Sequence, residues 1–250
     1  MAAGTDMARG PGGTARARRT GRVSGGLRPV VALVVVGVMA AACGGGGASS
    51  GPGRPGTDQA LIAKAQAATL QPADFTPGFA AQPEEPGQGL SIERVWQELT
   101  ACLGVKVKGA PAGVATSPTY LRGLATQGRS TVEYTTEPNA AALATALAGP
   151  KAQACFTRVF AADVDRSKPE GAKPGPVTVT TRQVPPAGDK IMAWRINASV
   201  NLDELVVPLF QDFLVIFNKG TVIRMFFLNP GAEFPQDLER SLLDKVVARA

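Results

Sequence analysis

Three sets of acidic residues lie close together in the sequence and are the first candidates for chemistry. Asp163 and Asp165 are two residues apart, and Glu84–Glu85 and Asp203–Glu204 are adjacent pairs. Paired carboxylates can act as acid and base in glycoside hydrolysis. Each set lies near the end of a predicted element or in a loop, so we interpret all three as solvated surface charge. Without further ligands at matching spacings, Asp163 and Asp165 do not predict a calcium site.

The composition excludes several other kinds of active site. The chain contains no histidine, which rules out Ser-His-Asp and Cys-His catalysis and any imidazole metal ligand. No serine is followed by lysine at the Ser-x-x-Lys spacing, and Ser167–Lys168 are adjacent in a predicted loop. We therefore predict a protein that is not an enzyme and uses no cofactor or metal. A hydrolase with a histidine-free site is the less favoured alternative.

Residues 1–42 have the order of an export signal. An arginine-rich stretch is followed by the apolar run Val30–Met39 and by three alanines. As a helix, residues 30–42 would cover about 20 Å, against about 30 Å of hydrocarbon. We predict a cleaved signal peptide rather than a membrane-spanning anchor, and Arg18–Arg19 leaves the twin-arginine export route open beside the general one.

The segment Val38–Gly44 resembles the lipobox of bacterial lipoproteins, in which a cysteine is acylated and becomes the first residue of the mature chain. The resemblance implies that Cys43 carries the lipid anchor, with fatty acids such as palmitate. It implies a protein exported to the outer face of the cell membrane. Ala40 stands where that family prefers leucine, so ordinary cleavage after an Ala-x-Ala site remains an alternative.

Acylation of Cys43 would leave an even pair of thiols, Cys102 and Cys155. In an oxidising compartment this pair can form a disulfide, which would stabilise the fold by about 4 kcal/mol through loop closure. No metal-ligand spacing competes for these cysteines. We predict the disulfide, and two buried free thiols are the alternative.

The elements that must position these residues follow from composition and periodicity. Residues 43–57 are predicted to form a flexible, lipid-anchored tether rich in Gly, Ser and Pro, and residues 58–250 to form one extracytoplasmic domain. The predicted helices span residues 58–70, 91–103, 138–149, 151–164 and 235–249, and the predicted strands span 129–135, 177–184, 190–200, 205–217 and 221–228. Residues 72–89 are predicted to be extended loop. The fold class is therefore α+β: an antiparallel sheet of about five strands packed with helices, with one helix-helix disulfide.

Strands 205–217 and 221–228 are apolar on both faces, so both faces should be covered. The simpler interpretation is a central strand pair between two helix layers, and the alternative is a pocket for an acyl chain. Arg224 interrupts one face and is expected to be paired or solvated, or to lie at the rim of such a pocket. Trp96 and Trp194 are expected in the core, and Pro208 predicts a bulge or an exposed strand edge.

The chain has a net charge of +6, but the position of this charge argues against a nucleic-acid partner. Residues 1–42 hold six of the 26 basic residues and one of the 20 acidic ones, so the rest of the chain carries +1. Binding to nucleic acid depends on neutralising phosphates with Lys and Arg. We expect no nucleic-acid binding.

Over residues 58–250 the chain resembles secreted actinobacterial lipoproteins, many without a characterised function. The resemblance lies in the segment Leu70–Phe79 (LQPADFTPGF), in a helix that ends Ala101–Val105 (ACLGV), and in a later helix that carries Cys155. These proteins are similar to the extracellular sensor domain of PknH-type kinases and to LpqN-type lipoproteins. The resemblance implies a non-catalytic domain that senses a ligand or binds an envelope protein. The alternative is a carrier of lipid or glycolipid with an apolar cavity, and no binding residue is carried over because no site motif matches.

Overall fold

The structure is a computed structural model that describes residues 58–82, 92–123, 126–168, 170–202 and 205–250. The predicted signal peptide, Cys43 and the tether lie outside the described residues. So do Glu84–Glu85 and Asp203–Glu204, two of the three acidic sets considered above. Among the described residues, no helix is both long and apolar enough to cross a bilayer.

The described helices follow the predicted ones closely. They are α1 (Gln59–Ala68), α2 (Ile92–Leu103), α3 (Glu137–Ala148), α4 (Ala152–Ser167) and α5 (Gln236–Arg249), with a single 3-10 turn, η1 (Pro72–Asp74). Local capping explains two of the starts. The Asp58 side chain accepts a hydrogen bond from the N–H of Ala60 at the start of α1, and the Thr136 hydroxyl accepts one from Asn139 at the start of α3.

The strands form one antiparallel sheet. They are β1 (Phe79–Gln82), β2 (Gly113–Thr116), β3 (Thr119–Arg122), β4 (Thr126–Tyr134), β5 (Lys173–Pro174), β6 (Thr178–Arg182), β7 (Lys190–Leu202), β8 (Leu205–Asn218) and β9 (Thr221–Pro230). Their order is β1-β3-β4-β9-β8-β7-β5, with β2 also paired to β4 and β6 also paired to β7. The predicted antiparallel meander from β6 to β9 is confirmed.

The α+β class is confirmed, but the expected count of about five strands is wrong. The described residues form a sheet of nine strands. The five predicted strands are all present, and the four additional ones, β1, β2, β3 and β5, have only two to four residues each. Such short segments show too few alternations to be recognised, and β1 lies within the Pro- and Gly-rich stretch predicted as loop. Pairing with longer neighbours is what holds them in the sheet.

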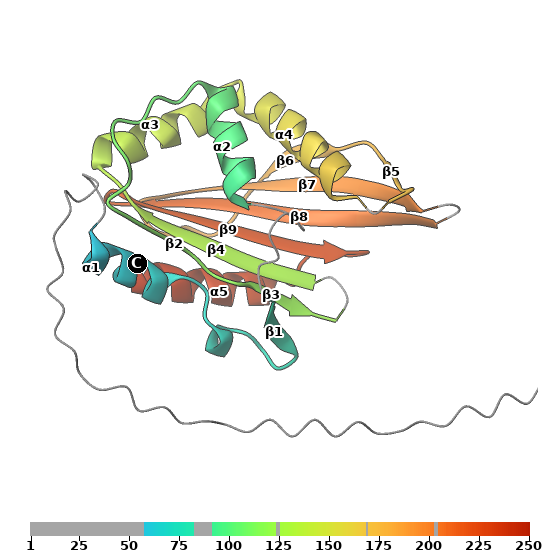
Figure 1. Ribbon diagram of the computed structural model, residues 1–250, viewed down its shortest axis with the longest axis horizontal. Coiled ribbons are helices and arrows are strands. Elements are labelled where there is room, and N and C mark those ends of the chain that lie inside the picture. The colour runs from blue at the N-terminus through green and yellow to red at the C-terminus, as the bar shows by residue number, and fades with distance from the viewer. Residues whose placement is uncertain (1–57, 83–91, 124–125, 169, 203–204) are drawn as a thin grey trace, which may run out of the picture. The chain divides into compact units, whose positions relative to one another are not determined.

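Helices cover both faces of the sheet, as Figure 1 shows: α2, α3 and α4 lie on one side and α1 and α5 on the other. Alternate residues of the central strands fill the two layers. Phe213, Val215 and Phe226 join the cluster under α2, α3 and α4. Leu214 and Ile223 join the cluster under α1 and α5. The interpretation of a central strand pair between helix layers is therefore confirmed.

A disulfide joins Cys102 near the end of α2 to Cys155 in the first turns of α4, as predicted. The two Cα atoms are 5.7 Å apart, and the cysteines are 53 positions apart in the chain. Cys155 is buried with Phe156 and Phe160 against the sheet. The bridge thus fixes the position of α2 over the sheet, which matters for the site described next.

Pro208 lies where the pairing of β8 with β9 ends, next to the free edge of β8, which is close to the second of its two predicted settings. It pairs with Ser199 of β7, and its carbonyl accepts a hydrogen bond from the N–H of Gly231, just past the end of β9. The nitrogen of proline cannot donate to a ladder, so an unpaired edge tolerates it. Leu205 and Val206, farther toward the end of this edge, are 61% and 59% exposed.

Candidate functional site

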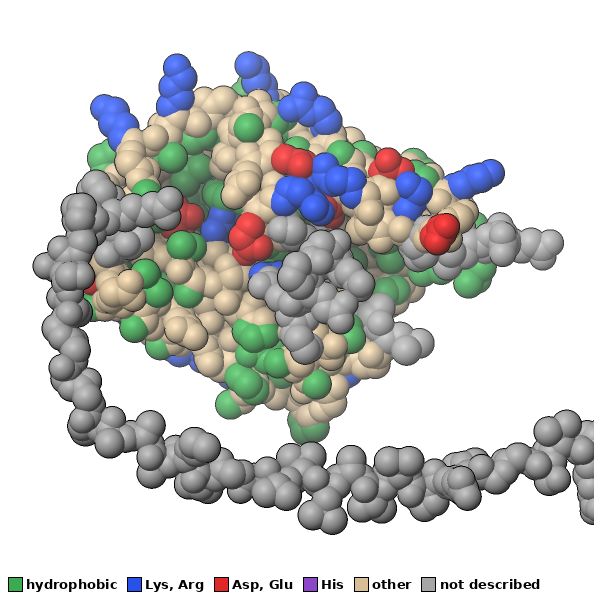
Figure 2. All heavy atoms as spheres, in the orientation of Figure 1, with side chains coloured by type: hydrophobic (Ala, Val, Ile, Leu, Met, Phe, Trp, Pro, Cys, Tyr) green, Lys and Arg blue, Asp and Glu red, His purple; other side chains and the backbone are tan. Residues whose placement is uncertain are grey.

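Strand β4 gives the sheet a polar strip on the face that α2, α3 and α4 cover. Arg129, Thr131 and Glu133 alternate along β4, and the first two are buried. On the neighbouring strand β9, Arg224 lies opposite Thr131. These four residues and Glu93 of α2 are called the α2–β4 cluster below. Figure 2 shows basic and acidic side chains together below α2, where the surface is hollowed between α2 and α3.

Arg224 is the most deeply buried charged member of the α2–β4 cluster. Its side chain is 4% exposed, and one Nη atom lies 3.4 Å from a carboxylate oxygen of Glu133. The guanidinium also lies over the Trp96 ring, 4.7 Å from its centre, a cation–π arrangement. Its Nε has no hydrogen-bond partner among the described residues. Burial lowers the pKa of Arg224, against the opposing charges of Glu133 and Glu93.

Glu93 connects α2 to the polar strip. Its carboxylate accepts a hydrogen bond from the Thr116 hydroxyl at 2.8 Å and lies 3.5 Å from Arg129. Burial disfavours the ionised form of Glu93, but the charge of Arg129 and the bond from Thr116 outweigh it, so the pKa lies below its ordinary value. Glu93 therefore remains an ion-pairing carboxylate at neutral pH, unlike a general acid.

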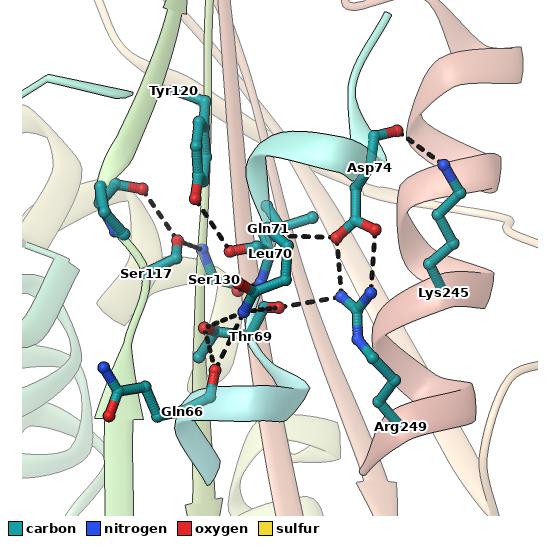
Figure 3. A network of polar contacts seen from close by, with 11 residues as sticks. Gln66, Thr69, Leu70, Gln71, Asp74, Ser117, Tyr120, Ser130, Lys245 and Arg249 are labelled. Carbon is teal, nitrogen blue, oxygen red and sulfur yellow. Dashed lines mark hydrogen bonds and ion pairs between the residues drawn. The ribbon is translucent and has the colours of Figure 1, made fainter. Parts of the chain in front are cut away.

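A second polar network ties the C-terminal end of α5 to η1 (Figure 3). Arg249 donates two hydrogen bonds to the Asp74 carboxylate, at 2.8 and 2.7 Å, and a third to the carbonyl of Thr69. Lys245 donates to the Asp74 carbonyl, and the N–H of Gln71 donates to the Asp74 carboxylate. All these acceptors are satisfied within the protein, so we assign the network a structural role.

Asp74 shows how these bonds affect ionisation. Burial alone would raise the pKa of Asp74, but the hydrogen bonds from Arg249 and Gln71 lower it below its ordinary value. Farther along the chain, the Tyr120 hydroxyl donates to the Leu70 carbonyl, and the Ser130 hydroxyl accepts from the N–H of Leu70. The segment Thr69–Asp74 is thereby fixed against β3, β4 and α5.

Two further carboxylates are buried within ion clusters. Asp163 of α4 receives a hydrogen bond from Arg94 of α2 at 3.0 Å. Asp212 of β8 is bound by the fork of Arg195 and lies 3.0 Å from Arg182. Burial raises the pKa of Asp163, and the Arg94 bond only partly opposes this.

The acidic pair Asp163 and Asp165 therefore does not behave as a unit. Asp163 is fully buried, so the expectation that it is solvated surface charge is wrong, whereas Asp165 is exposed and pairs with Lys168. On a helix, positions two apart point to different sides, which separates the two carboxylates. Ser167, expected in a loop, is the last residue of α4 and donates to the carbonyl of Asp163.

The remaining candidates lie as follows. Trp96 and Trp194 are buried in the core, as predicted. Arg224 is paired and buried, which agrees with one of the settings expected for it and excludes a solvated position. Within the described part of the chain, no three Cys, Asp or Glu side chains gather as a metal site would require.

Sequence reasoning did not single out Glu93, Arg129, Thr131 or Glu133. The signal was present as the alternation of polar residues along β4, in a strand whose other face carries Val132 and Tyr134. A polar face on a strand usually indicates solvent exposure. Only the packing of α2 over β4 turns it into a buried cluster.

Comparison with known proteins assigns no family. No family model matches the chain, and no curated protein matches it either. Among solved structures, PA94 from Pseudomonas aeruginosa, a protein of unknown function, is 12% identical, with 54% of this chain and 77% of that chain covered and a TM-score of 0.21.

Proposed function

We propose that this protein is an exported lipoprotein, anchored through Cys43 on the outer face of the cell membrane, whose domain binds a ligand or a partner protein and performs no catalysis. The proposal joins two lines of support. The leader and Cys43 indicate the compartment. The α2–β4 cluster provides buried arginines beside partly exposed carboxylates, an arrangement that can recognise a charged ligand.

The observation that carries the binding proposal is the burial of Arg129 and Arg224 in the α2–β4 cluster. A buried charge is costly unless it is paired and hydrogen-bonded, so proteins retain such groups mainly where they specify structure or recognise ligands. Here the side chains of Arg129 and Arg224 are only 8% and 4% exposed, and the carboxylate paired with Arg224, that of Glu133, lies 3.4 Å away.

The state of the buried carboxylates supports binding over turnover. A general acid needs a raised pKa together with access to substrate. The pKa of Glu93, whose side chain is 38% exposed, is lowered. The pKa of Asp163 and that of Glu239 are raised by burial, but Arg94 engages the first and Arg182 the second through hydrogen bonds.

The cavity near α3 does not favour an acyl-chain carrier. It has a volume of about 270 Å³ and lies between α3 and the turns at residues 189–190 and 219–220. Phe217 and three alanines share its lining with Glu137, Asp189, Lys190 and Lys219. An acyl chain is normally held by mostly apolar walls, and four charged residues do not provide them.

The test has two arms on the full-length protein expressed in a bacterium that processes lipoproteins. Mass spectrometry of the N-terminal peptide should show a diacylated Cys43, and Cys43→Ala should abolish membrane retention. Native mass spectrometry of the membrane-extracted protein should show a bound small polar species or a protein partner. An unmodified Cys43 in a cytosolic protein would overturn the anchoring, and a stoichiometric apolar lipid would favour the carrier instead.

A further inference from the structure

We propose that the α2–β4 cluster is a binding site for an anionic group, a carboxylate or a phosphate, with Arg224 as its anchor and Glu133 as the group that the anion displaces. The inference rests on the proposed binding function and deepens it by naming the ligand chemistry. It comes from how the ion clusters of this chain differ from one another.

In the other three buried clusters the most buried member is a carboxylate. The side chains of Asp163, Asp212 and Asp74 are 1%, 1% and 6% exposed. Arginines reach them from nearer the surface and donate hydrogen bonds of 2.7 to 3.0 Å. Such short charged bonds to a buried acid are typical of structural ion pairs.

The α2–β4 cluster has the opposite arrangement. Its most buried charged side chains are those of Arg224 and Arg129, at 4% and 8%, whereas those of Glu133 and Glu93 are 15% and 38% exposed. The cations lie inside and the acids lie toward solvent. A carboxylate that already reaches water can turn outward at little cost, but a guanidinium under α2 cannot leave.

Arg224 also retains donors for another acceptor. A guanidinium has five N–H groups in a planar fork. The contacts of Arg224 in the described residues are the ion pair with Glu133 at 3.4 Å and the face of Trp96, and its Nε lacks a hydrogen-bond partner. The Trp96 ring contacts the guanidinium without accepting an N–H···O hydrogen bond, so N–H donors of Arg224 remain for another acceptor.

The geometry of those donors selects the ligand. Carboxylates and phosphates match the guanidinium fork with two parallel hydrogen bonds, which a hydroxyl or an amide cannot do. Arg129, two positions from Thr131 on the same face of β4, adds a second positive charge, and the Thr131 hydroxyl adds a polar contact. An anion entering beside Glu133 would replace one carboxylate by another acceptor of the same charge sign.

The experiment uses the two tryptophans of the chain as reporters. Trp96 contacts Arg224, whereas Trp194 stacks on Phe156 elsewhere in the same layer. In the full-length protein labelled with ¹⁵N at tryptophan, titration with inorganic phosphate or with acetate, at constant ionic strength, should shift the Trp96 indole signal to saturation and leave that of Trp194 in place. The probe that binds more tightly identifies the anion as phosphate or carboxylate.

Three variants separate binding from a structural role. Arg224→Gln should weaken the response at least about tenfold, since it removes a charged fork. Glu133→Gln should increase the affinity for the anion several-fold, because the carboxylate that competes for Arg224 is gone. If the pair between Glu133 and Arg224 were purely structural, this substitution would not increase the affinity. Arg240→Gln, an arginine in an exposed pair on the opposite face, should match the wild type. The Trp194 signal reports whether each variant is folded.

The proposal is wrong if neither anion moves the Trp96 signal, or if Glu133→Gln binds more weakly than the wild type. It is also wrong if folded Arg224→Gln responds like the wild type. These failures leave the proposed function intact when native mass spectrometry still shows a bound neutral species or protein. If the anions leave the Trp96 signal unchanged and native mass spectrometry also shows no bound species, the proposed binding function is wrong as well.

Discussion

The ion pair between Asp74 and Arg249 permits a quantitative test of how much a buried ion pair stabilises this fold. Replacing Asp74 with asparagine keeps the shape of the side chain but removes its charge and one acceptor oxygen. The carboxylate accepts two hydrogen bonds from Arg249 and one from the N–H of Gln71, all at 2.7 to 2.8 Å. The Asp74 side chain is 6% exposed and that of Arg249 is 31% exposed.

The size of the effect follows from that geometry. Breaking a fully buried ion pair costs about 3 to 5 kcal/mol, but the partial exposure of Arg249 lets water take over some of its lost bonds. We therefore expect Asp74→Asn to lower the free energy of unfolding by about 2 to 3 kcal/mol near neutral pH. Urea denaturation of the full-length protein, followed by far-UV circular dichroism, measures it.

The same helix provides a matched control. Arg240 and Asp244 form an exposed i,i+4 pair on α5, with side chains 39% and 53% exposed. Exposed pairs of this kind contribute at most about 0.5 kcal/mol. Asp244→Asn should therefore change the free energy of unfolding by no more than that. Equal costs for the two substitutions would refute the view that burial makes the Asp74 pair strong.

The pH dependence of the difference provides an independent check. The pKa of Asp74 is lowered in the folded state. Its ionised form therefore contributes stability that is fully present above the unfolded pKa of about 3.9 and is lost as the pH falls through the folded pKa. The difference in the free energy of unfolding between the wild type and Asp74→Asn should decrease as the pH falls below about 4. A gap that stays constant into strong acid would show that the charge is not responsible.

Three further changes test other parts of the argument. Replacing Cys102 and Cys155 together by alanine should lower the free energy of unfolding by about 4 kcal/mol in urea, and reductant should bring the wild type to the same value; a reductant-insensitive wild type would contradict the disulfide. Gly113→Ala should lower the free energy of unfolding by about 1 to 3 kcal/mol, measured by thermal unfolding, because the added Cβ would lie 2.6 Å from the backbone of Leu61. An unchanged unfolding midpoint would mean that α1 packs less tightly against β2. Asp163→Asn should lower the free energy of unfolding in urea by about 1 kcal/mol or less, since burial already raises the pKa of Asp163 and favours a neutral group. A loss of stability as large as that of Asp74→Asn would contradict this.

Residues close in sequence determined much of this protein before tertiary structure entered. Long runs of β-branched and aromatic residues between turn signals were enough to place β7, β8 and β9, and periodic apolar positions placed α2 and α5, because strand propensity and helix period are local properties of the chain. The count of cysteines predicted the Cys102–Cys155 bridge.

Tertiary packing decided the rest. Strands of two to four residues, such as β1 and β5, are stable only through the neighbours that pair with them, so their own residues could not predict them. Asp163 has a sequence context like that of any surface acid, and only the approach of α2 buries it beside Arg94. The α2–β4 cluster joins residues from position 93 to position 224. Which charges lie inside and which face water depends on the distance between α2 and the sheet, a long-range property that no local pattern encodes.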